Sequence, residues 1–554
     1  MRFWWLLFLC AASAWAGSTQ TIPTQDRSGI QIKVGQLFDE QPRSGYAPLK
    51  ITITNDTPST HSWDFTFQSP GNSYGARGNT VTLQQSFSVP GNGERVFEVL
   101  VPLAIIGPSQ YVNSSLSVQS EGYGVSASSI QLATKGGGRG YSGPAVGYSL
   151  EIDRQSGSEI REKLEKGSVT FNASIDFARL PADWRALSGF DKIWITGNEW
   201  TALPPATRLA VEQWVATGGV LHVFTTAAAP STERRGFGEI KTVELAGAFQ
   251  IAMEVERNKA SISTQLSDGY RSNWPNKTLV PPYRPNSILL IGIIAVFGIV
   301  VGPVNFFIFA RREKRHRIFW TTPLLSIGGA LLVGLTILVQ DGFAGWGRRL
   351  ALIHLLPEQN SEVVLQEQAS RTGLLTGSGF EFDRTALIEP ITLDNLPQAA
   401  VFDGTHISGN WFSSRRIQGQ WIAAVRPSRA KVQIVNASEV AQGQPPKILS
   451  SIGATLDNFF WVDATTNRVW HGTGIGPGQT VTLSPVDSAA MESQLNLSLK
   501  GLPGPRLEAM RRQITMQPNS FYATARAPKD ALISTLSSIQ WRDDRVLYTG
   551  PVSP

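Results

Sequence analysis

Polar side chains that could do chemistry gather around two short apolar runs in the first half of the chain. The run "DKIWIT" is followed by Asn198, Glu199 and Trp200. The run "VLHVF" contains His222 and is followed by Thr225. If both runs are neighbouring parallel strands, the residues after them meet at the carboxyl edge of the sheet, where open α/β sheets bind ligands. The sequence therefore predicts a ligand-binding site built from Asn198, Glu199, Trp200, His222 and Thr225.

The same residues also allow a purely structural interpretation. Alternation along a strand places His222 on a packing face as readily as in a crevice, and a polar loop after a strand can serve only to begin a helix. A Glu, His and Thr combination could support hydrolysis, but no G-x-S-x-G nucleophile elbow accompanies it. We predict no catalytic residue, and the choice between a crevice and a core position stays open at this stage.

Other common catalytic and cofactor signatures are missing from the sequence. The six histidines are widely spaced and form no H-E-x-x-H or H-x-H pair, so no metal site is predicted. Cys10 is the one cysteine and falls in a predicted signal segment, which leaves the mature chain without a thiolate nucleophile. A G-x-G-x-x-G beginning at Gly138 is followed by Pro144 and a strand-like run instead of a helix, so we predict no dinucleotide and no other cofactor.

The elements around the candidate site alternate between strands and helices. Residues 145–280 contain strand-like runs such as "AVGYSLEID", "SVTFNASI", "DKIWITG" and "VLHVFTT", with helical segments such as "LPPATRLAVEQWVATGG" between them. Strand, helix and strand in that order favour a parallel sheet with helices on both faces. We therefore predict an α/β domain that carries the candidate site at the ends of its strands.

A family resemblance rests on this α/β segment. "FDKIWITGNEW" followed by "LPPATRLAVEQWVATGGVLHVF" resembles the strand, loop, helix and strand of class I glutamine amidotransferase-like domains. Enzymatic members of that family use a cysteine nucleophile at a strand-to-helix elbow with a His–Glu pair, and the predicted mature chain has no cysteine. The resemblance thus implies the fold without the amidotransferase chemistry. With "GPVNFFIFARREKRHRIFWTTPLL" added, the order of segments is similar to uncharacterised bacterial envelope proteins that carry a Gly-Pro-x-Asn membrane hairpin.

Two uncharged apolar runs predict a membrane hairpin. Residues 288–310 and 318–339 each exceed the roughly 20 residues that cross a bilayer as a helix. The short loop 311–317 between them carries five basic residues, namely Arg311, Arg312, Lys314, Arg315 and Arg317. The positive-inside rule places so short and basic a loop in the cytoplasm.

Three residues are predicted to shape the first membrane span: Gly302, Pro303 and Asn305. A proline inside a helix frees backbone groups that another donor or acceptor must satisfy. Asn305 is the nearest polar side chain, so we predict that it hydrogen-bonds the backbone groups that Pro303 frees and that the helix is kinked there. Neither span contains an ionisable residue, so we predict an anchor rather than a transport path.

The first residues predict export. Residues 1–16 carry one Arg, an apolar run and the triplet Ala14-Trp15-Ala16, which are typical of a cleaved secretory signal; a retained short anchor is the alternative. With the basic loop inside, both regions that flank the hairpin lie outside the cytoplasm. We therefore predict a cytoplasmic (inner) membrane protein with two transmembrane helices and extracytoplasmic N- and C-terminal domains.

The rest of the chain is predicted to be rich in β-structure. Residues 17–134 alternate in period two between turn residues, which is typical of an antiparallel β-sandwich. Residues 135–144, "KGGGRGYSGP", predict a flexible linker. Residues 341–554 return to β-branched runs and predict a C-terminal β-rich region. The predicted fold class is therefore multidomain, with a sandwich, an α/β parallel sheet, a membrane hairpin and a β-rich region.

The whole sequence predicts a binding role more than an enzymatic one. The formal net charge is only +6 and its basic residues are scattered, so we predict no nucleic-acid partner. We predict a membrane-anchored extracytoplasmic scaffold or binding protein of the bacterial cell envelope, whose partners are the lipid bilayer and other envelope proteins. The resemblance to envelope proteins implies an assembly with a MoxR-type ATPase and von Willebrand A-type membrane proteins. An envelope hydrolase using the α/β crevice and an accessory subunit of an export complex are the alternatives.

Overall fold

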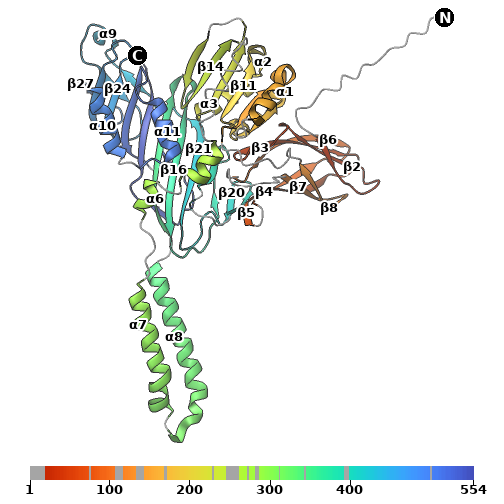
Figure 1. The fold of residues 1–554 in the computed structure, drawn as a ribbon, viewed down its shortest axis with the longest axis vertical. Coiled ribbons are helices and arrows are strands. Elements are labelled where there is room, and N and C mark those ends of the chain that lie inside the picture. The colour runs from red at the N-terminus through yellow and green to blue at the C-terminus, as the bar shows by residue number, and fades with distance from the viewer. Residues whose placement is uncertain are drawn as a thin grey trace, which may run out of the picture.

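A computed structural model of the chain shows a β-rich body that carries a projecting pair of helices (Figure 1). It describes residues 19–73, 76–105, 116–132, 143–166, 171–226, 230–244, 261–270, 274–280, 286–310, 312–341, 345–391, 393, 398–499, 502–528 and 530–553. The predicted signal segment 1–16, Arg311 and most of the predicted linker 135–144 lie outside the described residues.

The N-terminal part of the body is an antiparallel β-sandwich. Its strands are β1 (Thr19–Ile22), β2 (Ile30–Gln36), β3 (Tyr46–Asn55), β4 (His61–Ser73), β5 (Ala76–Val89), β6 (Gly93–Pro102), β7 (Leu116–Gly122) and β8 (Val125–Leu132). One sheet has the order β1-β2-β3-β6, and the other contains β5-β4-β7-β8. The period-two pattern places Trp63, Phe65 and Phe67 between the sheets, where they are at most 1% exposed. The predicted sandwich is thus confirmed, and burial of these rings stabilises it.

The second sheet of the sandwich continues into strands from the other end of the chain. These strands are β17 (Phe380–Glu381), β19 (Ala399–Asp403) and β20 (His406–Gly409), in the order β17-β20-β19-β5. β19 pairs in parallel with β5, with Val401 opposite Thr82. The predicted region 341–554 therefore does not fold apart from the predicted sandwich 17–134, because part of it completes a sandwich sheet.

The α/β part forms a six-stranded sheet with the order β10-β9-β11-β12-β14-β13. Its elements are β9 (Val146–Ser149), α1 (Leu150–Lys166), β10 (Asn172–Ile175), β11 (Lys192–Thr196), α2 (Gly197–Ala202), α3 (Pro205–Ala216), β12 (Val220–Thr225), β13 (Ser231–Arg235) and β14 (Gly238–Glu244). All neighbours pair in parallel except β13. Trp194 and Phe224 pack with Ile152 of α1, whereas Ile195 packs in the cluster that contains Val211 of α3. Helices therefore cover both faces, as the alternation predicted.

A large mixed sheet makes up most of the C-terminal region. Its main order is β18-β21-β16-β15-β30-β28-β24-β25-β27. These strands are β15 (Gly345–Leu356), β16 (Ser361–Thr372), β18 (Ala386–Ile391), β21 (Ile417–Pro427), β24 (Leu456–Val462), β25 (Val469–Ile475), β27 (Ser484–Val486), β28 (Ser520–Arg526) and β30 (Arg545–Ser553). Smaller elements are β22 (Val432–Ile434), α9 (Ala437–Val440), β23 (Lys447–Ser450), β26 (Thr480–Thr482), α10 (Ser488–Leu499), α11 (Pro505–Ile514) and β29 (Ile539–Trp541).

One apolar core joins the α/β part to this large sheet. Trp214 of α3, Trp421 of β21 and Leu352 of β15 belong to the same cluster of buried side chains. The segment that leads to the membrane hairpin, with α5 (Ile262–Thr264) and α6 (Pro275–Leu279), contributes Trp274 to that cluster. The α/β part and the large sheet therefore pack directly on each other within a multidomain body, in which the sandwich keeps a core cluster of its own.

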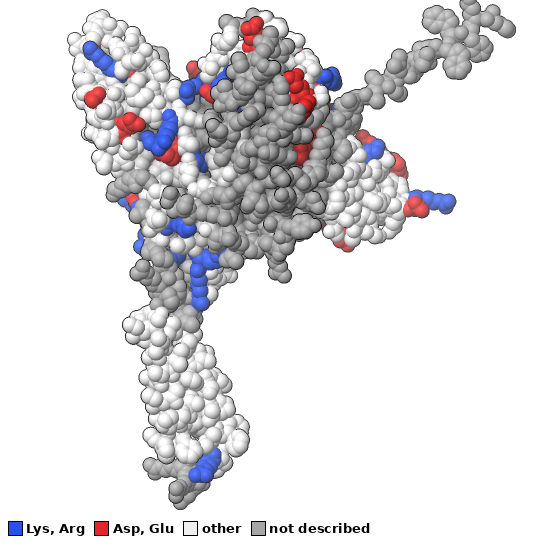
Figure 2. All heavy atoms as spheres, viewed as in Figure 1, with Lys and Arg blue, Asp and Glu red and all other residues white. Residues whose placement is uncertain are grey.

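The projecting pair of helices is the predicted hairpin. It consists of α7 (Ser287–Ile299), π-helical turns over Val300–Phe309, 3₁₀ turns over Arg312–Arg317 and α8 (Ile318–Asp341). Both helices are long and apolar enough to cross a membrane. Large apolar side chains on them face outward, with Phe319 and Trp320 each 81% exposed. Figure 2 shows an uncharged surface along the hairpin, with basic side chains at its tip and where it meets the body.

Candidate functional site

The predicted crevice lies at the carboxyl ends of β9 and β11, where the strand order reverses. Thr196 ends β11 and begins α2 through a capping box with Glu199. The Glu199 N–H donates to Thr196 Oγ1 at 3.2 Å, and Glu199 Oε2 accepts from the Thr196 N–H at 3.3 Å. The Thr196 hydroxyl donates to Glu151 Oε2 at 2.6 Å, and the Glu151 N–H donates to Glu199 Oε1 at 3.2 Å. Both carboxylates thus hold the first turns of α1 and α2.

Three other predicted site residues lie around the short helix α2. The Asn198 carbonyl accepts a hydrogen bond from the Thr201 hydroxyl at 3.0 Å, inside the helix. The Trp200 ring is covered by the Arg208 guanidinium, whose Cζ lies 4.6 Å from the ring centre. Thr225 lies against Gly197, where an added Cβ would come within 3.3 Å of Thr225 Cβ. These contacts fix the loop, while the Asn198 side chain itself is exposed.

His222 lies in the interior of the sheet. It is 5% exposed, pairs in register with Trp194 of β11, and stacks on Phe224 with ring centres 6.4 Å apart. Trp194 and Phe224 pack against α1, so His222 shares the face of the sheet that this helix covers. The structure therefore resolves the alternative left open by the sequence in favour of a core position.

Two members of this polar cluster, Glu151 and Thr196, were not predicted from the sequence. A signal for Thr196 was present, because "TGNE" is the T-x-x-E pattern of a capping box. Glu151 carries no such local signal, since it reaches Thr196 only through the pairing of β9 with β11. Among the described residues, no group of three or more His, Cys, Asp or Glu is placed to hold a metal ion.

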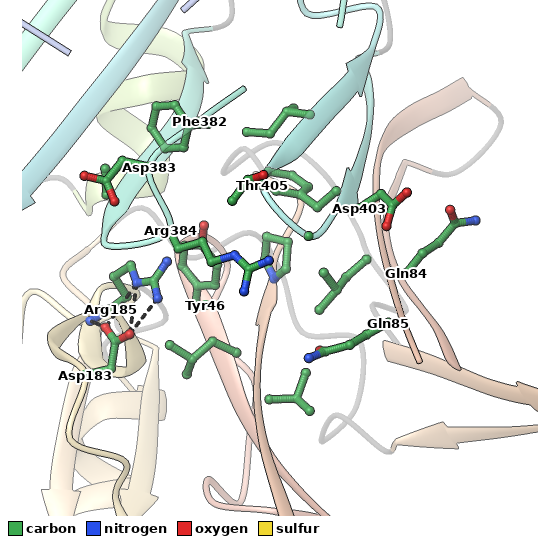
Figure 3. Close-up of a pocket in the computed structure, with 18 of the residues that line it drawn as sticks. Tyr46, Gln84, Gln85, Asp183, Arg185, Phe382, Asp383, Arg384, Asp403 and Thr405 are labelled. Atoms are coloured by element: carbon green, nitrogen blue, oxygen red, sulfur yellow. Dashed lines mark hydrogen bonds and ion pairs between the residues drawn. The ribbon is translucent and has the colours of Figure 1, made fainter. Parts of the chain in front are cut away.

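A cleft of about 610 Å³ lies where the three parts of the body meet (Figure 3). Its walls come from β5 and β6 of the sandwich, from residues 181–185 of the α/β part, and from the turns before β18 and after β19. Four acidic and two basic side chains line it, an excess of two negative charges: Glu98, Asp183, Asp383 and Asp403 against Arg185 and Arg384. No sequence motif marked this cleft, because its walls come from segments spread between residues 46 and 407 of the chain.

One side of the cleft is held by a preformed ion pair. Arg185 Nη2 lies 2.6 Å from Asp183 Oδ2, and the guanidinium covers the Tyr46 ring with Cζ at 5.3 Å from its centre. Burial raises the pKa of Tyr46, against the lowering effect of Arg185. The Arg384 side chain extends toward the side of the cleft where Gln84 and Gln85 lie (Figure 3). The cleft therefore offers polar and aromatic contacts, and two hydroxyls of its lining donate to carboxylates: Thr405 to Glu381 Oε2 at 2.6 Å and Ser86 to Asp64 Oδ1 at 2.5 Å.

Two buried carboxylates of the large sheet, Glu389 and Glu367, join it to other parts of the body, and a third carboxylate, Asp191, links two segments within the α/β part. Glu389 of β18 accepts from the Gly45 N–H of the sandwich at 2.7 Å. Glu367 of β16 accepts from the Gly504 N–H at 2.6 Å and from the Tyr270 hydroxyl. Burial raises the pKa of Glu367 to about 7, although these hydrogen bonds lower it. Asp191, whose pKa burial raises to about 6, accepts from the Ala145 N–H at 2.7 Å.

The hairpin residues have partly different roles from those predicted. Asn305 is 2% exposed, and its Nδ2 donates to Thr322 Oγ1 of the opposite helix at 2.9 Å. Its side chain therefore links the two helices, whereas the sequence predicted only a local hydrogen bond at the Pro303 break. Pro303 lies inside the π-helical turns, which accommodate the lost backbone donor. A side chain at Gly302 would meet nothing within 4 Å, so close packing does not explain this glycine.

The basic side chains of the loop 311–317, which forms the tip of the hairpin, are exposed where the structure describes them, as predicted. Lys314, Arg315 and Arg317 are exposed, and Arg315 Cζ lies 5.9 Å from the centre of the Phe306 ring. Arg312 begins the 3₁₀ turns of the loop. This concentration of cations at one end of an apolar hairpin is the pattern of a short loop between two membrane spans.

Comparison with known proteins gives no family for this chain. No family model matches it, and no curated protein matches it. Structures similar to part of it include a calcium-binding mutant of Bacteroides uniformis β-glucuronidase 2, at 11% identity over 36% of this chain and 24% of that one, with a TM-score of 0.15. An Amycolatopsis orientalis exo-chitosanase shows 11% identity over 38% and 23%, with a TM-score of 0.13.

A third structure is matched over a larger share of both chains, but at an equally low sequence identity and TM-score. The β-D-mannosidase of Dictyoglomus thermophilum matches at 9% identity over 86% of this chain and 76% of that one, with a TM-score of 0.15. The chain spans about a quarter to a third of the length of the first two β-glucuronidase structures it matches. Likenesses at TM-scores this low carry no argument, so the function has to be argued from the residues of this chain.

Proposed function

We propose that this chain is a membrane-anchored scaffold or binding protein of the bacterial cell envelope, with its body outside the cytoplasm and no catalytic activity of its own. The apolar hairpin with its basic tip supports the anchor and its orientation. The shared core and the buried carboxylate joints support a rigid body that presents fixed surfaces to partners.

The single observation that carries the non-enzymatic part of the proposal is the capping of the crevice. A catalytic carboxylate has to reach a substrate, yet Glu199 and Glu151 accept hydrogen bonds from backbone and hydroxyl groups of the first turns of two helices. His222, the only imidazole of the predicted site, packs in the interior. The crevice therefore lacks an exposed acid–base pair in hydrogen-bonding contact.

The cleft of Figure 3 is the partner-binding surface we propose for the scaffold. It exists only when the sandwich, the α/β part and the C-terminal strands are assembled, and its lining combines charged side chains with apolar ones such as Leu83 and Phe402, which suits a protein partner that has both kinds of surface. We include a MoxR-type ATPase and von Willebrand A-type membrane proteins among the proposed partners, and only the sequence resemblance to envelope proteins supports them.

Complementation of a deletion strain tests the non-enzymatic part. Replacing Glu199→Gln and His222→Asn together should leave complementation intact, because both changes remove acid–base function, and Glu199→Gln keeps the size of the side chain and one of the two acceptor oxygens that bind the Thr196 and Glu151 N–H groups. Protein levels in membranes, followed by immunoblot, control for folding. Loss of complementation at normal protein levels would favour the alternative of an envelope hydrolase acting from the crevice.

Crosslinking and pull-down from membranes test the binding part. The wild-type chain should capture a defined set of envelope proteins, and Arg384→Glu in the cleft should remove at least one of them. Arg429→Glu, at another exposed position, is the matched control and should capture the same set as the wild type. Identical captures for all three chains would contradict the cleft as the partner surface; capture of an exporter would favour the accessory-subunit alternative.

A further inference from the structure

The cleft of Figure 3 lies along an open edge of the sandwich. β6 is the last strand of the sheet β1-β2-β3-β6, and among the described strands it pairs with β3 alone. Glu98, Val99, Leu100 and Pro102 of this strand line the cleft. The free edge of one sandwich sheet therefore borders this space.

The register of β6 on β3 decides which backbone groups face the cleft. The Leu103 N–H donates to the Gly45 carbonyl at 2.8 Å, which continues the antiparallel register by one residue as a hydrogen-bonded pair. Such pairs alternate with pairs that share no hydrogen bond. Counting back along an uninterrupted register, Leu100 and Glu98 fall in pairs of the second kind. The partner of Leu100 is Pro48, which has no N–H to donate and so agrees with this assignment.

The N–H and C=O groups of Glu98 and Leu100 therefore point away from β3 and toward the cleft. Within the described part of the chain, neither of these two N–H groups donates a hydrogen bond. Pro102 has no N–H and ends this row of open donors. An unpaired edge of this kind can accept another strand through backbone hydrogen bonds.

The second sandwich sheet extends beyond this edge. β19 and β20 continue it past β5, and their register places Leu83, Phe402 and Ile407 in one row across three strands. Residues in register on neighbouring strands share a face of the sheet. Leu83 packs against the sandwich core, so this row lies on the inner face, and all three side chains line the cleft. The cleft thus lies where a further strand beside β6 would cover the row.

The charges of the lining favour a basic segment. Apart from the ion pair of Asp183 with Arg185, the lining carries three carboxylates and one guanidinium, all exposed: Glu98, Asp383, Asp403 and Arg384. Within the residues that the structure describes, none of these three carboxylates takes part in an ion pair. Lys50 lies opposite Glu98 in register but does not line the cleft. The excess of two negative charges attracts lysine and arginine side chains.

We propose that the cleft binds an extended segment of a partner protein, which pairs with β6 as a fifth strand of that sheet and alternates apolar and basic side chains. Val99 faces the sandwich core, so Glu98 faces outward. The apolar side chains of the segment therefore lie over the row of Leu83, Phe402 and Ile407, and its basic side chains lie on the face of Glu98. The inference rests on the proposed function, in which the cleft is the partner surface, and names the kind of segment that binds there.

Binding of a synthetic peptide to the full-length chain in detergent tests this inference. The probe is an end-blocked heptapeptide of alternating lysine and valine, followed by fluorescence anisotropy. Two further forms carry backbone N-methyl groups on the valines or on the lysines. Alternate N–H groups of a strand point to opposite edges, so one form should bind at least about tenfold more weakly than the parent and the other should bind like it. Equal binding of all three peptides would overturn the inference.

Variants of the cleft separate the backbone edge from the charges. Leu100→Pro removes an N–H that faces the cleft but no hydrogen bond to β3, and it should bind the peptide at least about tenfold more weakly. Glu98→Gln with Asp403→Asn leaves the edge intact and should weaken binding at low salt but not at high salt.

A matched control addresses charge elsewhere on the sandwich. Asp56→Asn with Glu121→Gln removes two exposed carboxylates that do not line the cleft, and this variant should bind the peptide like the wild type. Equal weakening by the control and by the cleft pair would contradict the charge preference.

Hydrogen exchange shows where the peptide lies. The Glu98 and Leu100 amides, resolved by electron-transfer fragmentation, should exchange at least about tenfold more slowly with the peptide. Exchange in β24 and β28 should not change, and the same segments report whether each variant is folded. Slow exchange of both amides in the free chain, or a dimer that Leu100→Pro dissociates, would show that the edge is already covered and would overturn the inference.

The outcomes distinguish this inference from the proposed function. If the peptide does not bind but Arg384→Glu still removes a captured partner, the added strand is wrong and the partner surface stands. If the wild type and Arg384→Glu capture identical proteins, the partner surface itself is contradicted.

Discussion

Thr196 and Glu199 show how residues that could do chemistry are used for structure. Thr196 caps α2, and Glu199 completes the capping box. Glu151, in the first turn of α1 after the neighbouring strand β9, accepts a hydrogen bond from the Thr196 hydroxyl. The residue types and their place at a sheet edge suit a ligand site, but the first turns of two helices need the same oxygens. At the scale of single residues, hydrogen-bond geometry therefore weakens the catalytic interpretation.

A first prediction concerns this cap. Thr196→Val removes the hydroxyl that accepts the Glu199 N–H and donates to Glu151, so the free energy of unfolding should fall by about 1 kcal/mol. Thermal unfolding of the purified chain in detergent measures the change. Thr201→Val, whose hydroxyl bonds only carbonyls inside the same helix, is the control and should cost less. An equal cost for both variants would contradict the cap.

A second prediction concerns Glu367. Its pKa is about 7 in the folded chain against an ordinary 4.5, so the folded state keeps a proton that the unfolded state has released. The contribution of Glu367 to the free energy of unfolding should therefore be greatest below pH 4.5. It should fall by at most about 3 kcal/mol as the pH rises through about 7. Unfolding temperatures of the wild type and Glu367→Gln between pH 4.5 and 7.5 measure this. The variant should show a flatter pH dependence, and parallel curves would contradict the prediction.

At the scale of elements, the described side chains of the apolar hairpin include one hydrogen bond between its two helices, from Asn305 to Thr322. The proline break is absorbed by π-helical turns, which leaves the Asn305 amide free to reach Thr322. Gly329 lies so close to Phe297 that an added Cβ would come within 2.3 Å of the ring. The hairpin thus combines small-residue packing with an interhelical hydrogen bond, the usual means by which helices associate in lipid.

A third prediction follows for this hydrogen bond. Asn305→Leu and Thr322→Val should each destabilise the hairpin by about 1 kcal/mol, and the double variant should cost less than the sum. A double-mutant cycle from unfolding in mixed micelles measures the coupling. Thr321, which bonds the Arg317 carbonyl on its own helix, provides the control: Thr321→Val should show no coupling to Asn305→Leu. Full additivity of the Asn305 and Thr322 changes would rule out the contact.

At the scale of the whole molecule, chain segments far apart in sequence complete one another. β19 extends the sandwich sheet beyond β5, and the α/β part shares its core with the C-terminal sheet. The apolar hairpin is therefore inserted in the middle of a body whose parts are packed together. Its two helices leave and re-enter that body at one end (Figure 1).

A fourth prediction concerns truncation. A secreted fragment covering residues 17–280 keeps the sandwich and the α/β part but loses β19 and the large sheet. It should aggregate or be degraded rapidly, because an open β5 edge and one face of a shared core become exposed. Limited proteolysis compares this fragment with the full chain, and co-expression of residues 286–554 is the control that should restore resistance. A stable, monomeric fragment would contradict a single body.

A fifth prediction concerns orientation. Alkaline-phosphatase fusions should be inactive at about residue 316 and active at about residues 280 and 400, because the enzyme needs an extracytoplasmic location and the positive-inside rule places the basic tip in the cytoplasm. Fusion protein levels provide the control. Activity at residue 316 would reverse the orientation and remove the extracytoplasmic body from the proposed function.

The sequence by itself determined the elements whose signals are local. Period-two alternation specified the sandwich strands, strand–helix alternation specified the parallel sheet, and uncharged runs around a basic loop specified the hairpin. Only the tertiary structure decided what depends on pairing between distant segments: the joining of β19 to β5, the place of His222 in the core, the bond from Asn305 to Thr322, and the cleft between three parts. Local patterns report which residues are buried, but not which buried surface they meet, because many apolar faces are equivalent until the whole chain is packed.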